Sequence, residues 1–142
     1  MTPHRRSLGR SHALAVVGAI VLLVACVLPW WRAGGGEGIP AASGNAFESS
    51  GILVFLVAIA TLALVALPYA AGDRPVALDR WLSYAILSAV GWIGIGLRVF
   101  QLALQEPAVL LPDRAPGLWL AVVGMIIITR ATYDLSRTPA YR

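Results

Sequence analysis

The chain has 142 residues, of which 58% are hydrophobic and 13% charged, with a net charge of +4 and a mean hydropathy of +0.77. Soluble domains carry about 25% charged residues, and a small protein needs a large polar surface to stay dissolved. The composition all but excludes a soluble globular domain, a disordered chain and a disulfide scaffold, and it favours a membrane protein.

Four apolar segments follow one another along the chain. A transmembrane helix needs about 20 apolar residues, because the hydrocarbon core is about 30 Å thick. Asp79 can cap the third helix, and Pro116 suits the first position of the fourth. The sequence predicts an all-α single domain, a transmembrane four-helix bundle with up-down connectivity. The expected spans are about 12–31, 51–71, 81–104 and 116–133.

Aromatic residues gather at the ends of these segments. Trp prefers the membrane boundary, where its ring is dry and its N–H meets water. The fourth segment is short, and Arg130 at its end can extend its long side chain to the headgroups. Trp92 lies in mid-segment and is expected to pack against a neighbouring helix. The expected interfacial anchors are Trp30, Trp31, Trp81, Trp119 and Arg130.

The positions of the arginines predict the orientation. All eleven basic residues are arginines, and cytoplasmic loops carry an excess of basic residues. With the N-terminus inside, eight arginines lie on the cytoplasmic side, and only Arg32, Arg98 and Arg114 lie at the outer side. We therefore expect a multi-pass protein with both termini in the cytoplasm. Loops 32–50 and 105–115 are then outside and loop 72–80 inside, and the glycines of 32–50 predict a flexible loop.

The N-terminal region also has features of an export signal. Residues 5–8 resemble a twin-arginine motif, and Leu-Val-Ala-Cys at 23–26 has the form of a lipobox, in which Cys26 would be lipidated. The apolar run continues past Cys26 to Trp31, and three more spans follow, which suits an inserted first helix better. We expect Cys26 to be a packed side chain, with lipidation as the alternative.

Arg98 is the only charged residue within an apolar segment. A charge in the hydrocarbon costs several kcal/mol, which makes such a residue a candidate functional group. It lies roughly 25 Å along the third helix from Trp81, near the outer boundary. Its guanidinium is expected to extend outward or to pair with an outer-loop acid, Glu106, Glu48 or Glu37. The alternative is a role in binding a ligand or lipid headgroup, or in gating.

No set of residues specifies a reaction. Both histidines, His4 and His12, lie at the N-terminal end, and the single cysteine cannot form a metal cluster. No acidic residue lies within a span, whereas proton-coupled transporters normally need one. We expect no enzymatic activity, no metal, no cofactor and no nucleic-acid partner.

The chain as a whole resembles a known group of proteins. A basic tail, a span ending in Leu-Pro-Trp-Trp at 28–31, a glycine-rich loop and Gly51 at the start of the next span carry the resemblance. These features are similar to small four-span integral membrane proteins of unknown function that are common in high-GC actinobacteria. The resemblance covers nearly the whole chain. It implies a location in the bacterial plasma membrane and assigns no catalytic residue.

Three functions follow from these expectations. The leading one is an accessory or scaffold subunit in the lipid bilayer, whose partner is another membrane protein or a second copy of the chain. Small residues such as Gly91, Gly94 and Gly124 support close helix contacts of this kind. The alternative is a small transporter or channel formed by oligomerisation, with Arg98 near an outer vestibule. A weaker alternative is a lipoprotein lipidated at Cys26.

Overall fold

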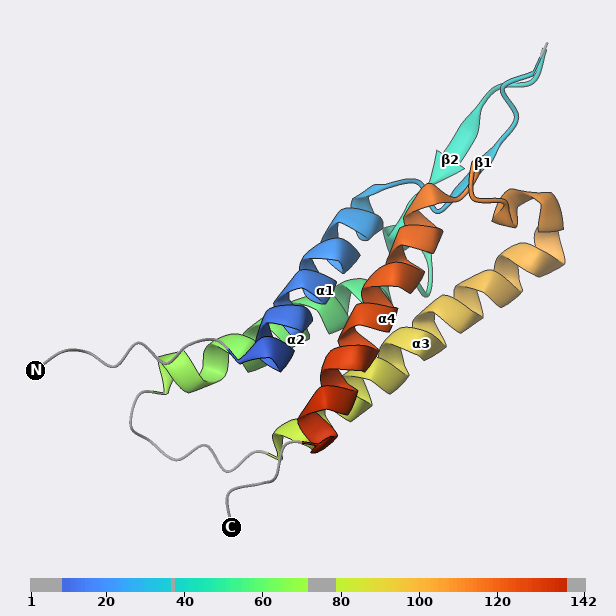
Figure 1. Cartoon of the computed structure of the whole chain (residues 1–142). Helices are drawn as coiled ribbons and strands as arrows, with labels where there is room; N and C mark the ends of the chain where they lie inside the picture. The colour runs from blue at the N-terminus through green and yellow to red at the C-terminus, as the bar shows by residue number, and fades with distance from the viewer. Residues whose placement is uncertain (1–8, 37, 72–78, 138–142) are drawn as a thin grey trace, which may run out of the picture.

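A computed structural model of the chain shows a bundle of four α-helices with a β-hairpin at one end (Figure 1). The structure describes residues 9–36, 38–71 and 79–137. The helices are α1 (Arg10–Val27), α2 (Ile52–Ala70), α3 (Arg80–Gln105) and α4 (Pro116–Arg137). Each is long and apolar enough to cross a membrane. The predictions of a mainly helical fold and of four candidate spans are confirmed, and the hairpin adds two short strands to the expected all-α fold.

The helix starts follow local signals that the sequence contains. The Asp79 carboxylate accepts a hydrogen bond from the Leu82 amide at 3.2 Å and caps α3, as predicted. Pro116 is the first residue of α4, where its missing N–H costs no hydrogen bond. α2 begins without a side-chain cap, and the nearby Ser49 hydroxyl forms a hydrogen bond with Gln101 instead.

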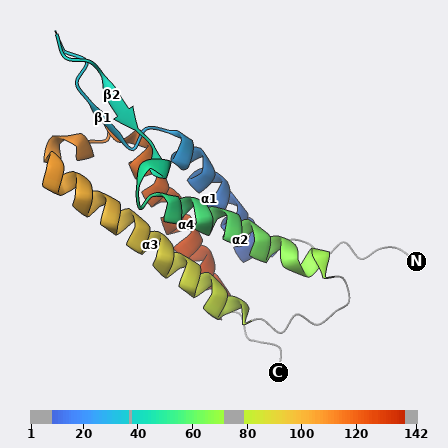
Figure 2. The same cartoon turned by 180° about the vertical axis from the view of Figure 1, so that it is seen from behind.

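The four helices form a ring in which each contacts two neighbours, and Figure 2 shows α2 and α3 from behind. The closest contact joins α1 and α4. A Cβ added to Gly18 would lie 3.1 Å from the Gly124 carbonyl oxygen, and one on Gly124 would lie 3.2 Å from the Gly18 carbonyl oxygen. Two facing glycines let the backbones approach, which maximises dispersion contacts where lipid offers no hydrophobic driving force.

The interior and the surface of the bundle are both apolar. Leu22, Met125 and Ile128 are fully buried at the centre. Large apolar side chains such as Leu56 and Ile93 are about half exposed on the outside. A surface of this kind would aggregate in water, so the arrangement fits a bundle surrounded by lipid.

The described residues between α1 and α2, 28–36 and 38–51, adopt defined structure, which differs from the flexible loop that the glycines suggested. β1 (Trp31–Ala33) and β2 (Ala42–Gly44) pair antiparallel, with Arg32 opposite Ser43. Gly34, Gly35 and Gly38 have positive φ angles of 76°, 87° and 81°, so these glycines make the turn that reverses the chain. Two short 3-10 helices, η1 (Ala46–Glu48) and η2 (Pro107–Leu110), complete this hairpin end.

Candidate functional site

Trp30 joins the helices to the hairpin. Leu28 has an extended backbone (ψ 156°) because Pro29 follows it, so α1 ends at Val27, four residues before the predicted end. The chain then turns back, and the Trp30 indole N–H donates to the Ala25 carbonyl at 2.8 Å. This bond satisfies one of the carbonyls that a helix end leaves without a partner.

Two glycines make room for the Trp30 ring. A Cβ on Gly117 would lie 2.7 Å from Trp30 Cδ1, and one on Gly51 would lie 3.0 Å from Trp30 Cζ3. The Gly117 amide also donates to the Pro29 carbonyl at 2.9 Å. Trp30 therefore fixes the ends of α1, α2 and α4 against one another.

Polar side chains gather beside this ring, between η1, the start of α2 and the last turns of α3. We call them the Arg98 cluster; its members are Glu48, Ser49, Ser50, Arg98 and Gln101. The Ser49 hydroxyl and Gln101 Oε1 are 2.7 Å apart in a hydrogen bond. Glu48 Oε2 accepts from the Trp31 indole N–H at 3.1 Å. These bonds join the hairpin to η1 and η1 to α3.

Arg98 lies inside the bundle rather than on its surface. Its side chain is only 8% exposed, and the charge of Glu48 acts on its guanidinium. Within the described part of the chain, the guanidinium makes no ion pair, and the buried Nε has no hydrogen-bond partner. The buried hydroxyl of Ser50 also lacks a partner. Glu48 is one of the acidic residues expected to pair with Arg98; its charge acts on the guanidinium without an ion pair among the described residues.

The Arg98 cluster has the chemistry of a binding site for hydrogen-bond acceptors. A guanidinium offers five N–H donors and no acceptor, and it stays protonated in proteins. It therefore attracts carboxylate, phosphate or carbonyl oxygens. Among residues 9–36, 38–71 and 79–137, no group of three or more His, Cys, Asp or Glu side chains could hold a metal ion. The cluster is suited to holding an anion or a hydrogen-bond acceptor.

The other candidate residues divide by exposure. Trp81 and Trp119 are each 47% exposed, as expected of interfacial side chains, and the Trp119 indole N–H donates to the Leu110 carbonyl at 2.9 Å. Trp31 is half-buried, whereas Trp30 is fully buried and so does not face lipid. Arg130 is exposed near the far end of α4.

Cys26 is fully buried in the main core cluster, as expected of a packed side chain. Sequence reasoning missed the roles of Gly51, Gly117 and the Ser49–Gln101 hydrogen bond, which depend on contacts between residues far apart in the chain. The short distance from the glycines to a tryptophan at a helix end was not visible in any local pattern.

Comparisons with protein-family models, curated proteins and solved structures find no match. The function must therefore be inferred from the described geometry.

Proposed function

We propose that this chain is an integral protein of the bacterial plasma membrane that acts by binding another membrane protein, as an accessory or scaffold subunit, and catalyses no reaction. The observation that supports this proposal is the β-hairpin, which projects beyond the helices (Figure 1). The hairpin tip does not help to pack the bundle, since a Cβ on Gly36 or Gly38 would meet no atom within 4 Å. Ordered loops of this kind commonly carry binding functions.

The hairpin has two features that suit a protein partner. Its sheet has only two strands, so β1 and β2 each present an edge that can pair with another chain. Its tip carries Ile39, whose side chain is 64% exposed. A large apolar side chain on a segment outside the spans is typical of a contact surface.

Site-specific crosslinking in the native membrane tests this proposal. We expect a photo-crosslinking residue in place of Ile39 to give a discrete adduct with one protein, whereas one in place of lipid-facing Phe100 gives none. Adducts of equal yield from both positions, or none from position 39, would refute a contact through the hairpin.

The proposal includes up-down connectivity with both termini in the cytoplasm. It is supported by the positive-inside distribution of arginines and by Figure 1, where α1 begins and α4 ends away from the hairpin. Single cysteines test it, because the buried native Cys26 gives little background labelling. We expect Ile39→Cys to react with a membrane-impermeant thiol reagent in intact cells, and Ser136→Cys to react only after lysis. The reverse pattern would overturn the orientation.

A small channel or transporter formed by oligomerisation is the second candidate, and the buried Arg98, whose Nε has no hydrogen-bond partner in the described part of the chain, favours it. Intramembrane charges commonly mark ion pathways. Side chains fill the interior of a single bundle, so a pore would have to form between several copies of the chain. Native mass spectrometry distinguishes the candidates, since a strict monomer would count against a channel.

The lipoprotein alternative receives no support from the packing of α1. Cleavage before Cys26 would remove most of α1 and expose the face of α4 around Gly124, which contacts Gly18 and Leu22. Intact mass decides the matter, because a full-length mass without added lipid excludes lipidation.

A further inference from the structure

A groove opens on the outer surface between α3 and α4, in the half of the bundle away from the hairpin. It has a volume of about 330 Å³ and is lined by Trp92, Ile126, Thr129, Arg130 and Tyr133. All five side chains are exposed, so the groove faces lipid if the helices span a membrane. We call it the Trp92 groove.

The apolar part of the Trp92 groove is held in place by hydrogen bonds. The Trp92 indole N–H donates to Thr129 Oγ1 at 3.0 Å, and the Thr129 hydroxyl donates to the Met125 carbonyl at 2.8 Å. Trp92 is 38% exposed, so it packs against α4 as expected but also keeps one face open. The ring and Ile126 thus form an apolar wall in a fixed position.

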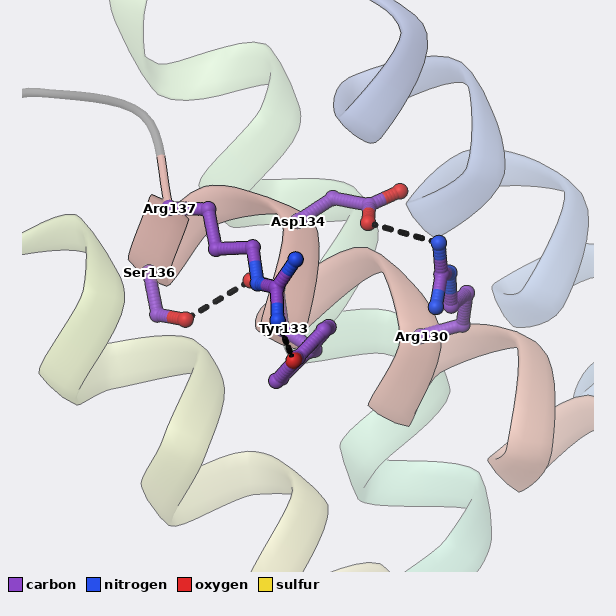
Figure 3. Close-up of polar contacts among 5 residues, drawn as sticks. All are labelled: Arg130, Tyr133, Asp134, Ser136 and Arg137. Atoms are coloured by element: carbon purple, nitrogen blue, oxygen red, sulfur yellow. Dashed lines mark hydrogen bonds and ion pairs between the residues drawn. The ribbon is translucent and has the colours of Figure 1, made fainter.

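Toward the end of α4 the groove is lined by Arg130 and Tyr133, and Arg137 lies beside it against Tyr133 (Figure 3). Arg130 lies 3.3 Å from an Asp134 carboxylate oxygen, and its side chain remains 63% exposed. The Arg137 guanidinium lies over the Tyr133 ring, with its carbon 4.5 Å from the ring centroid, and donates to the Tyr133 hydroxyl. Two arginines and one aspartate leave a formal charge of +1 here, with guanidinium N–H groups still facing outward.

The depth of Arg130 explains why a headgroup would reach it. The uncharged part of α4, residues 117–129, spans about 20 Å, whereas the hydrocarbon core is about 30 Å thick. A bilayer adapts to a short span by thinning locally and by extension of flanking side chains. The lipid phosphates nearest α4 are therefore drawn toward Arg130.

We infer that the Trp92 groove binds one anionic phospholipid from the leaflet at this end of the bundle. The phosphate contacts Arg130 and Arg137, and an acyl chain lies along Trp92 and Ile126. The groove matches such a lipid because it is apolar toward the membrane centre, cationic toward the surface, and of net positive charge. The inference goes beyond the proposed partner contact and depends only on insertion in a membrane.

The full-length chain, purified in detergent, allows a direct test by native mass spectrometry with phosphatidylglycerol or phosphatidylcholine. We expect the wild type to retain phosphatidylglycerol preferentially. Arg130→Gln combined with Arg137→Gln removes the cationic end, with an expected loss of about fivefold per arginine, which corresponds to about 1 kcal/mol each. Ile126→Trp fills the apolar part without changing charge and should also reduce retention severalfold.

Matched controls carry the same substitutions elsewhere. Arg114→Gln removes an exposed arginine at the hairpin end, and Ile59→Trp enlarges an exposed side chain on α2; both should retain the wild-type preference. The inference stands only if the double arginine variant loses the preference for phosphatidylglycerol, Ile126→Trp retains less lipid, and both controls behave as the wild type does. Equal retention of the two lipids by the wild type, an unchanged preference in the arginine variant, unchanged retention by Ile126→Trp, or an equal loss in a control overturns it.

Discussion

Replacing Arg98 by methionine should stabilise the folded protein. A buried guanidinium with incomplete hydrogen bonding destabilises the fold, because its interactions with protein groups do not fully offset the free-energy cost of removing the charge from water. Arg98 is 8% exposed, its Nε has no hydrogen-bond partner, and only the attraction of Glu48 compensates its charge. Methionine keeps the apolar stem of the side chain in a similar volume and removes the charge.

The magnitude follows from the position of Arg98. An arginine at the centre of a membrane helix costs about 2.5–3.5 kcal/mol on insertion scales. Arg98 lies near one boundary and is attracted by Glu48, so its cost is smaller than that of an arginine at the membrane centre. We expect Arg98→Met to raise the free energy of unfolding by about 1–2 kcal/mol. For a chain of this size, a gain of 1 kcal/mol raises Tm by about 2–4 °C.

Thermal unfolding in detergent, followed by tryptophan fluorescence, measures this gain. The matched control is Arg114→Met, which replaces an exposed arginine and should change stability by less than about 0.5 kcal/mol. Arg98→Lys keeps a buried charge and should not be stabilised. Breaking a buried ion pair lowers the free energy of unfolding by about 3–5 kcal/mol. If Arg98→Met lowers Tm by the amount that corresponds to such a loss, Arg98 is fully paired in the folded protein and the reasoning is refuted.

Three further experiments test the packing. Gly18→Val should destabilise the bundle by about 1–3 kcal/mol, because the new side chain overlaps α4. Its control is Gly96→Ala, where a Cβ meets nothing within 4 Å, which should be neutral or slightly stabilising. A comparison of the Tm values of the two variants tests this difference. Trp30→Phe should cost about 1 kcal/mol through loss of the indole hydrogen bond to α1, and an unchanged Tm would contradict that role. A double-mutant cycle of Ser88→Ala and Thr132→Val should give a coupling of about 0.6 kcal/mol for the 3.2 Å contact between their hydroxyls, and additive effects would show that the contact contributes nothing.

The helices could be predicted from the sequence because their signals are local. A span is set by the length of an uncharged segment, and the starts of α3 and α4 are set by Asp79 and Pro116. The end of α1 was placed too late, although Pro29 already disfavoured helix at Leu28. Hydropathy continued through Trp31 and concealed the backbone restriction imposed by proline.

The hairpin end could not be predicted in the same way. Glycine content indicates conformational freedom, but whether that freedom gives a flexible loop or a defined turn depends on pairing across the hairpin. Trp30 shows a similar limit. Tryptophan prefers the membrane boundary on average. Trp30 is buried instead, because the Ala25 carbonyl at the end of α1 needs a donor and because Gly51 and Gly117 leave space for the ring.

The inward position of Arg98 was missed because lipid and protein interior are both apolar, so hydropathy does not show which face of a membrane helix is packed. Small residues do show it, since close helix contacts require them. At about 100° per residue, Arg98 lies about 20° from the direction of Gly91, seven residues earlier, and one turn after Gly94, and both glycines contact neighbouring helices. Arg130 lies six residues after Gly124, about 120° away from the packed face of α4, and is exposed. The position of an arginine relative to the glycine face, rather than its distance from the end of the span, therefore separates the buried arginine from the exposed one.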